Sequence, residues 1–292
     1  MKIEILQPLG INELGNRQNQ EDSVYPDIST ATSGDRLFLV CDGMGGHEHG
    51  EVASRLVCDV LPRYLKEHWT GTLLMDDILH DAIDEVFRQI NTLDDGSTKQ
   101  MGTTLTLLAF HQGGATMAHI GDSRIYHLRP GEGRLLYKSR DHSLVYDLFL
   151  AGEIAQREMA TYDKKNVITR AIMPGQERQP KMDMAHTTDI QPGDYFILCS
   201  DGMLEKMTDQ ELLSLLRSNT TNEEKRDQLI TATKDNADNH SAWLIQVKDV
   251  AFEENDEQQK NDESSVGCNA LIYETAATKP DSLLRRFIKW LK

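Results

Sequence analysis

Two segments in the N-terminal third of the chain carry apolar residues at the spacing of an amphipathic helix. Between 76 and 93, apolar side chains recur every three or four positions, which places them on one helical face. A second helix is predicted over 48–69, with a bend near Pro62, because proline lacks the N–H that a helix interior uses. Each helix therefore offers an apolar face for packing on another layer.

Short apolar runs rich in β-branched and aromatic residues predict strands, several of which end in an acidic or glycine turn. The predicted strands cover 36–41, 104–110, 116–120, 124–128, 195–199 and 242–247. Because the strands group apart from the long helices, a layered α+β domain is favoured over a repeated βαβ unit. Between 142 and 179 no period persists, which is typical of short helical pieces in an inserted subdomain or lid.

The composition changes after Val250. A stretch rich in acids over 251–265 is typical of a solvated linker. In the tail that follows, 266–292, a helix predicted over 282–292 has six apolar side chains on one face and four basic ones on the other. Such a helix suits weak contact with a membrane surface or a partner groove, and docking on its own domain is the equally weighted alternative.

Charge and composition narrow the classes of function. The 292 residues include 47 acids against 31 Lys+Arg, a formal charge of −16, which is the wrong sign for binding nucleic acid. No apolar stretch approaches the roughly 20 residues of a bilayer span, and the N-terminus does not resemble a signal peptide, so a cytoplasmic location is expected. Cys41, Cys58 and Cys199 lie in or after apolar runs, as buried reduced thiols would.

The candidate chemistry lies in acids at strand ends and in turns. Five aspartates occupy such positions: Asp22, Asp42, Asp122, Asp201 and Asp238. A single aspartate of this kind is more often a cap or a turn residue. If several converge in one cleft, however, their repulsion requires bound cations, and oxygen ligands favour magnesium or manganese over zinc.

Two of these acids stand in matching contexts. Asp42 begins DGMGGH directly after the apolar run LFLVC, and Asp201 begins DGMLEKM after YFILCS. Glycines after Asp42 allow backbone carbonyls to approach a metal closely. Asp122 lies in a tight turn between two predicted strands, and Asp238 precedes the last predicted strand.

These motifs, in their order, resemble those of a bacterial metal-dependent Ser/Thr protein phosphatase of the 2C class, the PPM family. The resemblance covers about residues 1–250 and leaves the tail unmatched. It is carried by RQNQED, LFLVCDGMGGHEHGEVAS, MGTTLTLLAF, AHIGDSRIYHLR, SRDHSLVYDLFLAGEI, NVITRAI, YFILCSDGMLEKM and DNHSAWLIQV. It implies a central antiparallel β-sandwich flanked by helices on both faces, a four-layer αββα arrangement, with a flap subdomain over 142–179.

The resemblance also implies a binuclear manganese or magnesium centre. Asp42 matches the carboxylate that bridges both ions, and the Gly43 carbonyl matches a ligand of the first ion. Asp201 and Asp238 match the carboxylates of the second ion.

Three further acids complete the implied ligand set. Asp22 contributes directly or through water, and its neighbour Glu21 is the alternative, because the sequence leaves open which of the two reaches the metal. Asp122 matches the residue that holds a third, weaker ion in bacterial members.

Arg17 matches the arginine that grips the phosphoryl oxygens, which a dianionic substrate near an acidic cleft requires. The implied reaction is direct hydrolysis by a water that bridges the two metals. The eukaryotic general-acid position is Met44 here, and a thioether cannot donate a proton. His47 is the candidate donor, with a structural hydrogen bond as the alternative. Gln20, where the family more often has asparagine, is expected to alter hydrogen bonds around the metal ligands.

The implied function is hydrolysis of phosphoserine and phosphothreonine in proteins, opposing a bacterial Ser/Thr kinase. Two alternatives stay open at this point, a pseudophosphatase adaptor and a metal hydrolase of another fold acting on small phosphoesters. The complete set of acids argues against the first, and the order of the motifs argues against the second. The flap is expected to shape substrate choice and occupancy of the third metal.

Overall fold

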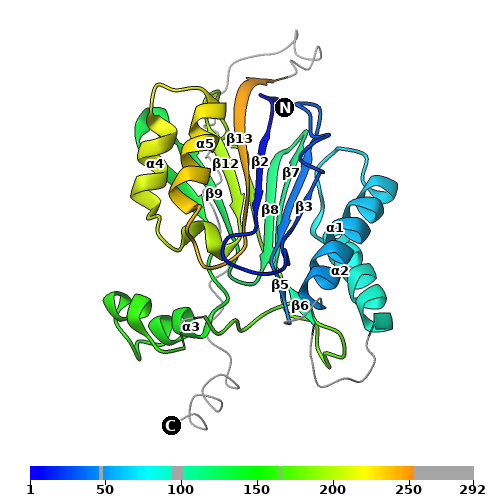
Figure 1. Ribbon diagram of the computed structural model, residues 1–292. Helices are drawn as coiled ribbons and strands as arrows, with labels where there is room; N and C mark the ends of the chain where they lie inside the picture. The colour runs from blue at the N-terminus through cyan, green and yellow to red at the C-terminus, as the bar shows by residue number, and fades with distance from the viewer. Residues whose placement is uncertain (46–48, 94–100, 165, 253–292) are drawn as a thin grey trace.

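Two antiparallel sheets form the centre of the computed structural model, which describes residues 1–45, 49–93, 101–164 and 166–252 (Figure 1). In the larger sheet the strands run in the order β10–β9–β12–β13, and β1 and β2 both pair with β13. Their bounds are β1 Lys2–Ile5, β2 Leu9–Glu13, β9 Arg124–Arg129, β10 Arg134–Lys138, β12 Tyr195–Cys199 and β13 His240–Ala251.

The second sheet has the order β11–β8–β7–β4–β3. Its strands are β3 Ser23–Tyr25, β4 Leu37–Cys41, β7 Leu105–His111, β8 Gly114–Ile120 and β11 Asp183–Thr187. A separate two-stranded ribbon, β5 Gly43–Met44 with β6 Gly102–Thr103, extends the end of this sheet where β4 finishes.

Helices cover the outer face of each sheet (Figure 1). Helices α1 His49–His68 and α2 Asp76–Ile90 pack on the five-stranded sheet and share a core with the outward residues of β4 and β7. Helices α4 Asp209–Arg217 and α5 Asn222–Thr233 pack on the other sheet through a second core. A third core lies between the sheets. The α+β sandwich expected from the sequence is confirmed, and its layers follow the expected αββα order.

Most predicted elements agree with the structure within a few residues. The helix predicted over 76–93 is α2 followed by the 3-10 turn Asn91–Leu93, and the one predicted over 48–69 is α1, with Pro62 inside it. The segment 142–179 contains helix α3 Leu144–Leu150 and the 3-10 helix Gln156–Thr161, as short helical pieces were expected. The strand predicted over 242–247 is longer, because β1 and β2 give β13 partners at both ends.

The sequence analysis missed several short strands and the helices α4 and α5, which lie near the C-terminal end of the domain. The linker predicted over 251–265 begins one residue early, because Ala251 still belongs to β13; the rest of it from 253 on, and the tail 266–292 with its basic helix, lie outside the described residues. Within the described ranges, none of the helices combines the length and apolarity of a transmembrane span.

The core between the sheets depends on Trp243 of β13. Its side chain is fully buried and packs edge-on against the Phe38 ring, with 5.4 Å between the two ring centroids. We expect Trp243→Ala to lower the free energy of unfolding by about 3–5 kcal/mol, because an aromatic deletion leaves a cavity in a packed core. Urea unfolding monitored by circular dichroism measures this. Phe252→Ala, at a position that is 71% exposed, should stay within about 0.5 kcal/mol of the parent chain. Equal losses in both variants would contradict the packing described here.

Candidate metal centre

One end of the sandwich gathers the aspartates that the sequence singled out. Strand pairing explains why residues distant in the sequence meet there. Ser23 pairs with Cys41, so Asp22, which precedes β3, lies beside Asp42, which follows β4. Cys199 pairs with Arg124 on one side and Ala242 on the other, which brings the ends of β12, β9 and β13 together. Asp201, Asp122 and Asp238 flank those strand ends.

The electrostatics of Asp42 show how closely these acids converge. Burial raises the pKa of Asp42 well above its ordinary value, and the charges of the four other aspartates raise it further. Asp201 shares a hydrogen bond with Asp42, yet burial and the neighbouring charge of Asp238 still raise its pKa. A protein without cations at this site therefore has to hold several of these carboxyl groups protonated.

Two carboxyl oxygens in the group are buried without a hydrogen-bond partner, Asp22 Oδ1 and Asp122 Oδ1. The other oxygen of Asp22 accepts a 2.8 Å hydrogen bond from Ser200 Oγ. Burial, with neighbouring aspartates, raises the pKa of Asp22 to about 7 and that of Asp122 to about 8. Orphaned, buried carboxyl oxygens that repel one another are the donor set a hard divalent cation requires.

The backbone around Asp42 is held from several sides. Thr104 Oγ1 accepts a hydrogen bond from the Asp42 amide at 2.9 Å, and Thr104 N and Thr103 Oγ1 both donate to the Asp42 carbonyl. Gly43 has no room for a side chain, because a Cβ there would lie 2.3 Å from the Gly50 carbonyl oxygen. The chain after β4 is thus fixed in one path.

Asp238 is oriented by its neighbours at the edge of the group. Its Oδ2 accepts a 2.6 Å hydrogen bond from the Arg17 guanidinium, and its Oδ1 accepts one from the Asn239 amide. The Asn239 side chain in turn donates to the carbonyls of Leu14 and Asn19 and accepts from the Glu21 amide. Arg17 is half exposed, so its guanidinium faces solvent at the mouth of the site.

The other predicted site residues fall in different places. Glu21 acts electrostatically on Arg17, while its carbonyl oxygen accepts hydrogen bonds from Gly43 N and Ser54 Oγ. His47 lies outside the described residues, so its part as proton donor stays a prediction. Met44 occupies β5 beside the group.

The sequence analysis singled out neither Ser200 nor Asn239 as a functional residue. Both sit directly beside a singled-out aspartate, and that adjacency was the one available signal.

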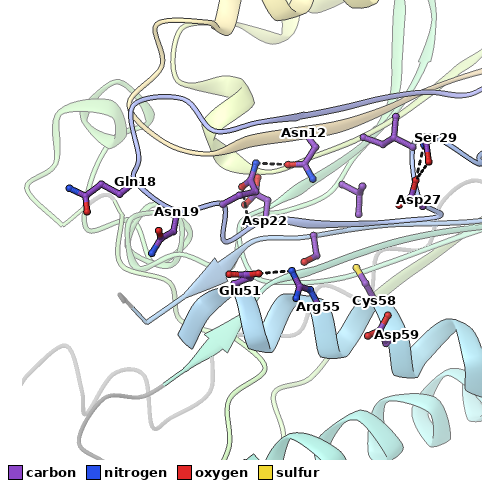
Figure 2. Close-up of a pocket in the computed structure, with 14 residues that line it drawn as sticks. Asn12, Gln18, Asn19, Asp22, Asp27, Ser29, Glu51, Arg55, Cys58 and Asp59 are labelled. Atoms are coloured by element: carbon purple, nitrogen blue, oxygen red, sulfur yellow. Dashed lines mark hydrogen bonds and ion pairs between the residues drawn. The ribbon is translucent and has the colours of Figure 1, made fainter. Parts of the chain in front are cut away.

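A cavity of about 770 Å³ opens beside Asp22 (Figure 2). It lies between the segment before β3 and helix α1, and Asp22 is part of its lining. Helix α1 contributes Glu51 and Arg55, which form a 2.5 Å ion pair, and Asp59 (Figure 2). Of the five aspartates, Asp22 is the one that borders this cavity.

Comparison with known proteins decides the family. A family model described as protein phosphatase 2C matches residues 10–236. The chain belongs to the protein phosphatase 2C family. Among curated relatives of this phosphatase, the serine/threonine phosphatase stp of Listeria monocytogenes is 34% identical over 200 residues, which cover 67% of this chain and 77% of the relative.

Solved structures agree with this phosphatase assignment. The crystal structure of the Mycobacterium tuberculosis serine/threonine phosphatase PstP/Ppp superposes with a TM-score of 0.71 at 31% identity, covering 84% of this chain and 99% of that one. The catalytic domain of PstP in complex with two manganese ions superposes with a TM-score of 0.68 at 32% identity, with the same coverage.

The raised pKa values predict an unusual dependence of stability on pH in the metal-free phosphatase. Between about pH 6.5 and 8, Asp22 and Asp122 retain protons in the folded chain that the unfolded chain has lost, so stability falls as pH rises. Buried His111 and His119, whose pKa values are lowered to about 4, act in the opposite sense near pH 6.5, because the unfolded chain still loses their protons there; the larger pKa shifts of the two aspartates outweigh them. We expect a loss of about 1–2 kcal/mol with chelator present, measured by urea unfolding at both pH values.

Added Mn²⁺ should reverse that dependence, because a bound cation replaces the protons and binds more tightly as pH rises. Asp122→Asn should flatten the metal-free profile, since one of the titrating groups is gone. A metal-free protein that gains stability steadily from pH 6.5 to 8 would contradict the clustering of these acids.

Proposed function

We propose that this chain hydrolyses phosphoserine and phosphothreonine in proteins, with Mn²⁺ or Mg²⁺ bound among the aspartates at one end of the sandwich. The observation that carries the proposal is the convergence of five acidic side chains, two with orphaned buried oxygens, beside a half-exposed arginine. A group of anions that repel one another has no structural use without cations. With divalent cations bound, such an acidic site can catalyse the hydrolysis of phosphoesters.

Asp42, at the centre of the group, would hold both of two ions, and the Gly43 carbonyl would help to hold the first of them. Asp201 and Asp238 belong to the second ion. Asp22, buried with a free Oδ1, contributes in preference to Glu21, whose backbone takes part in the hydrogen bonds that hold the site. A third, weaker ion belongs to Asp122.

The chain's own residues bind and orient the substrate. When bound, the ions supply the positive charge that activates water and offsets the charge of the phosphoryl oxygens. Arg17 offers a planar guanidinium at the mouth of the site, where a dianionic phosphoryl group competes with Asp238 for it. Ser200 and Thr104 hold Asp22 and Asp42 in place through direct hydrogen bonds.

The departing serine or threonine oxygen requires a proton. Met44 cannot supply one, because its thioether carries no acidic hydrogen. His47 is the proposed donor, either directly or through water. A phosphoprotein substrate implies a Ser/Thr kinase that made it, and a cytoplasmic location for both belongs to the same proposal.

Substitution of Asp201 tests the metal assignment. We expect Asp201→Asn to retain less than about 1% of the Mn²⁺-dependent rate on a phosphothreonine peptide, because loss of a charged ligand weakens a metal and the activation it supplies. Colorimetric phosphate release measures the rate, and chelator should abolish it in the parent chain. Asp209→Asn, at an acid that bonds Tyr126 and Lys138 away from the site, is the matched control. Full activity in Asp201→Asn would refute the assignment.

The role of Arg17 in binding the phosphoryl group is tested by comparing its effect on substrate binding with its effect on metal binding. Arg17→Ala should raise KM for the phosphopeptide about tenfold or more, because a charge-assisted hydrogen bond to phosphate is lost. The Mn²⁺ concentration at half-maximal rate should change less than about threefold. Arg17→Lys should recover part of the loss, since a point charge replaces the planar fork. An unchanged KM in Arg17→Ala would exclude contact with the phosphoryl group.

A further inference from the structure

Hydrogen bonds from two consecutive residues, Asp141 and His142, enclose the turn that carries Asp122. The N–H of Gly121, the residue just before Asp122, donates to His142 Nδ1 at 3.0 Å. The Gly121 carbonyl oxygen accepts a hydrogen bond from the His142 N–H at 2.9 Å. Arg124, two residues after Asp122, forms a bidentate ion pair with Asp141 at 2.7 and 2.6 Å. We call Asp141 and His142 the flap base, because they lead into the flap segment and helix α3, which lies off both sheets (Figure 1).

The second ring nitrogen of His142 faces the other end of the flap. Because Nδ1 accepts an amide hydrogen, a neutral ring carries its proton on Nε2, which lies 3.2 Å from Asp183 Oδ2 and 3.0 Å from the Arg170 guanidinium. Asp183 also receives hydrogen bonds from Arg170 at 2.8 Å and Arg140 at 3.3 Å. His142 stands where the flap begins, and its buried ring therefore joins the turn of Asp122 to the Arg170–Asp183 pair near the other end of the flap.

The same residues could be mistaken for a metal site. Ligand atoms of His119, His142 and Asp183 lie within 4.8 Å of one another, and His119 Nδ1 has no hydrogen-bond partner. The two imidazole rings, however, are stacked at 4.5 Å with an angle of 11° between their planes. Their in-plane lone pairs thus lie in two nearly parallel planes and do not converge on one ion. The guanidinium groups already paired with Asp183 disfavour a cation further.

The turn passes any displacement at His142 on to the aspartates. The Gly121 carbonyl that His142 binds belongs to the peptide bond of Asp122. Gly121 has a φ of +106°, and a Cβ there would lie 2.5 Å from Thr104 Cγ2, so the turn has little freedom. On the other side of Asp122, Ser123 Oγ lies 2.7 Å from Thr104 Oγ1, the atom that accepts the Asp42 amide.

We propose that His142 is a positioning residue that links the flap to Asp122. Its Nδ1 side fixes the turn that aims the Asp122 carboxyl group, and its Nε2 side senses the Arg170–Asp183 pair at the far end of the flap. The inference rests on the proposed function in so far as Asp122 is taken as a ligand of the third ion. It adds the residue through which the flap acts on that ligand.

Two isosteric substitutions separate the two sides of the ring. In His142→Asn the amide oxygen replaces Nδ1 but nothing reaches Asp183, whereas in His142→Gln the amide reaches Asp183 but leaves the Gly121 amide unpaired. We expect Gln to raise amide hydrogen exchange over residues 119–125 and the half-saturating Mn²⁺ concentration at least about fivefold, because a buried donor loses its partner. Asn should leave both within about twofold.

The Nε2 side has a separate readout. His142→Asn should lower the rate on a phosphothreonine peptide relative to that on a small aryl phosphate, because the flap loses its link. Asp183→Asn should reproduce this effect without altering the ring. Thr169→Val, which removes a flap hydrogen bond to Asp147 at 3.1 Å, is the matched control for both readouts. Melting temperatures identify any variant that fails to fold.

The exchange measurement is made on metal-free protein, so it stands even if the chain proves to have no phosphatase activity. Such a result would end the proposed function and leave the link between His142 and the turn under test. If Asn and Gln raise exchange over 119–125 equally, or if Gln leaves it unchanged, His142 does not position Asp122. A raised half-saturating Mn²⁺ concentration in Thr169→Val would show that any change in the flap has this effect. That result would also overturn the assignment of His142 as the positioning residue.

Discussion

Repulsion among buried carboxylates is the constraint on which the rest of this phosphatase depends. Asp42 is surrounded by four other aspartates, and burial and their charges raise its pKa well above the ordinary value. Folding alone does not favour such a group, because each charge loses hydration and gains a like-charged neighbour. The group can carry its full negative charge only when cations occupy the site, and the surrounding structure holds the acids in place for them.

Two kinds of contact hold the five aspartates in place. Strand register brings the ends of β3, β4, β9, β12 and β13 to the same end of the sandwich. Short side chains then fix individual groups, as Ser200 does for Asp22 and Thr104 does for the Asp42 amide. Because the residues in these contacts directly flank the ends of packed strands, the carboxyl groups have little freedom to move apart when charged. The flap base adds a contact from outside the sandwich at the turn of Asp122.

The sequence predicted the parts of this structure that repeat a local signal. Asp42 and Asp201 each follow an apolar strand and precede a glycine, and the long helix over 76–90 has a clear apolar face. Helix α5 lacks such a face and depends on the capping box of Thr221 and Glu224, with Leu229 buried in the core. The role of His142 was also beyond the sequence, because its partners Gly121 and Asp183 are distant along the chain and meet only through the fold.

In the site proposed here, the five aspartates surround divalent cations. Anomalous diffraction from crystals grown with Mn²⁺ tests it most directly, because the signal locates the metal without reference to activity. We expect two strong peaks beside Asp42, within coordination distance of Asp22, Asp201 or Asp238, and a weaker one beside Asp122. No peak among these side chains, or a peak confined to His119, His142 and Asp183, would contradict it.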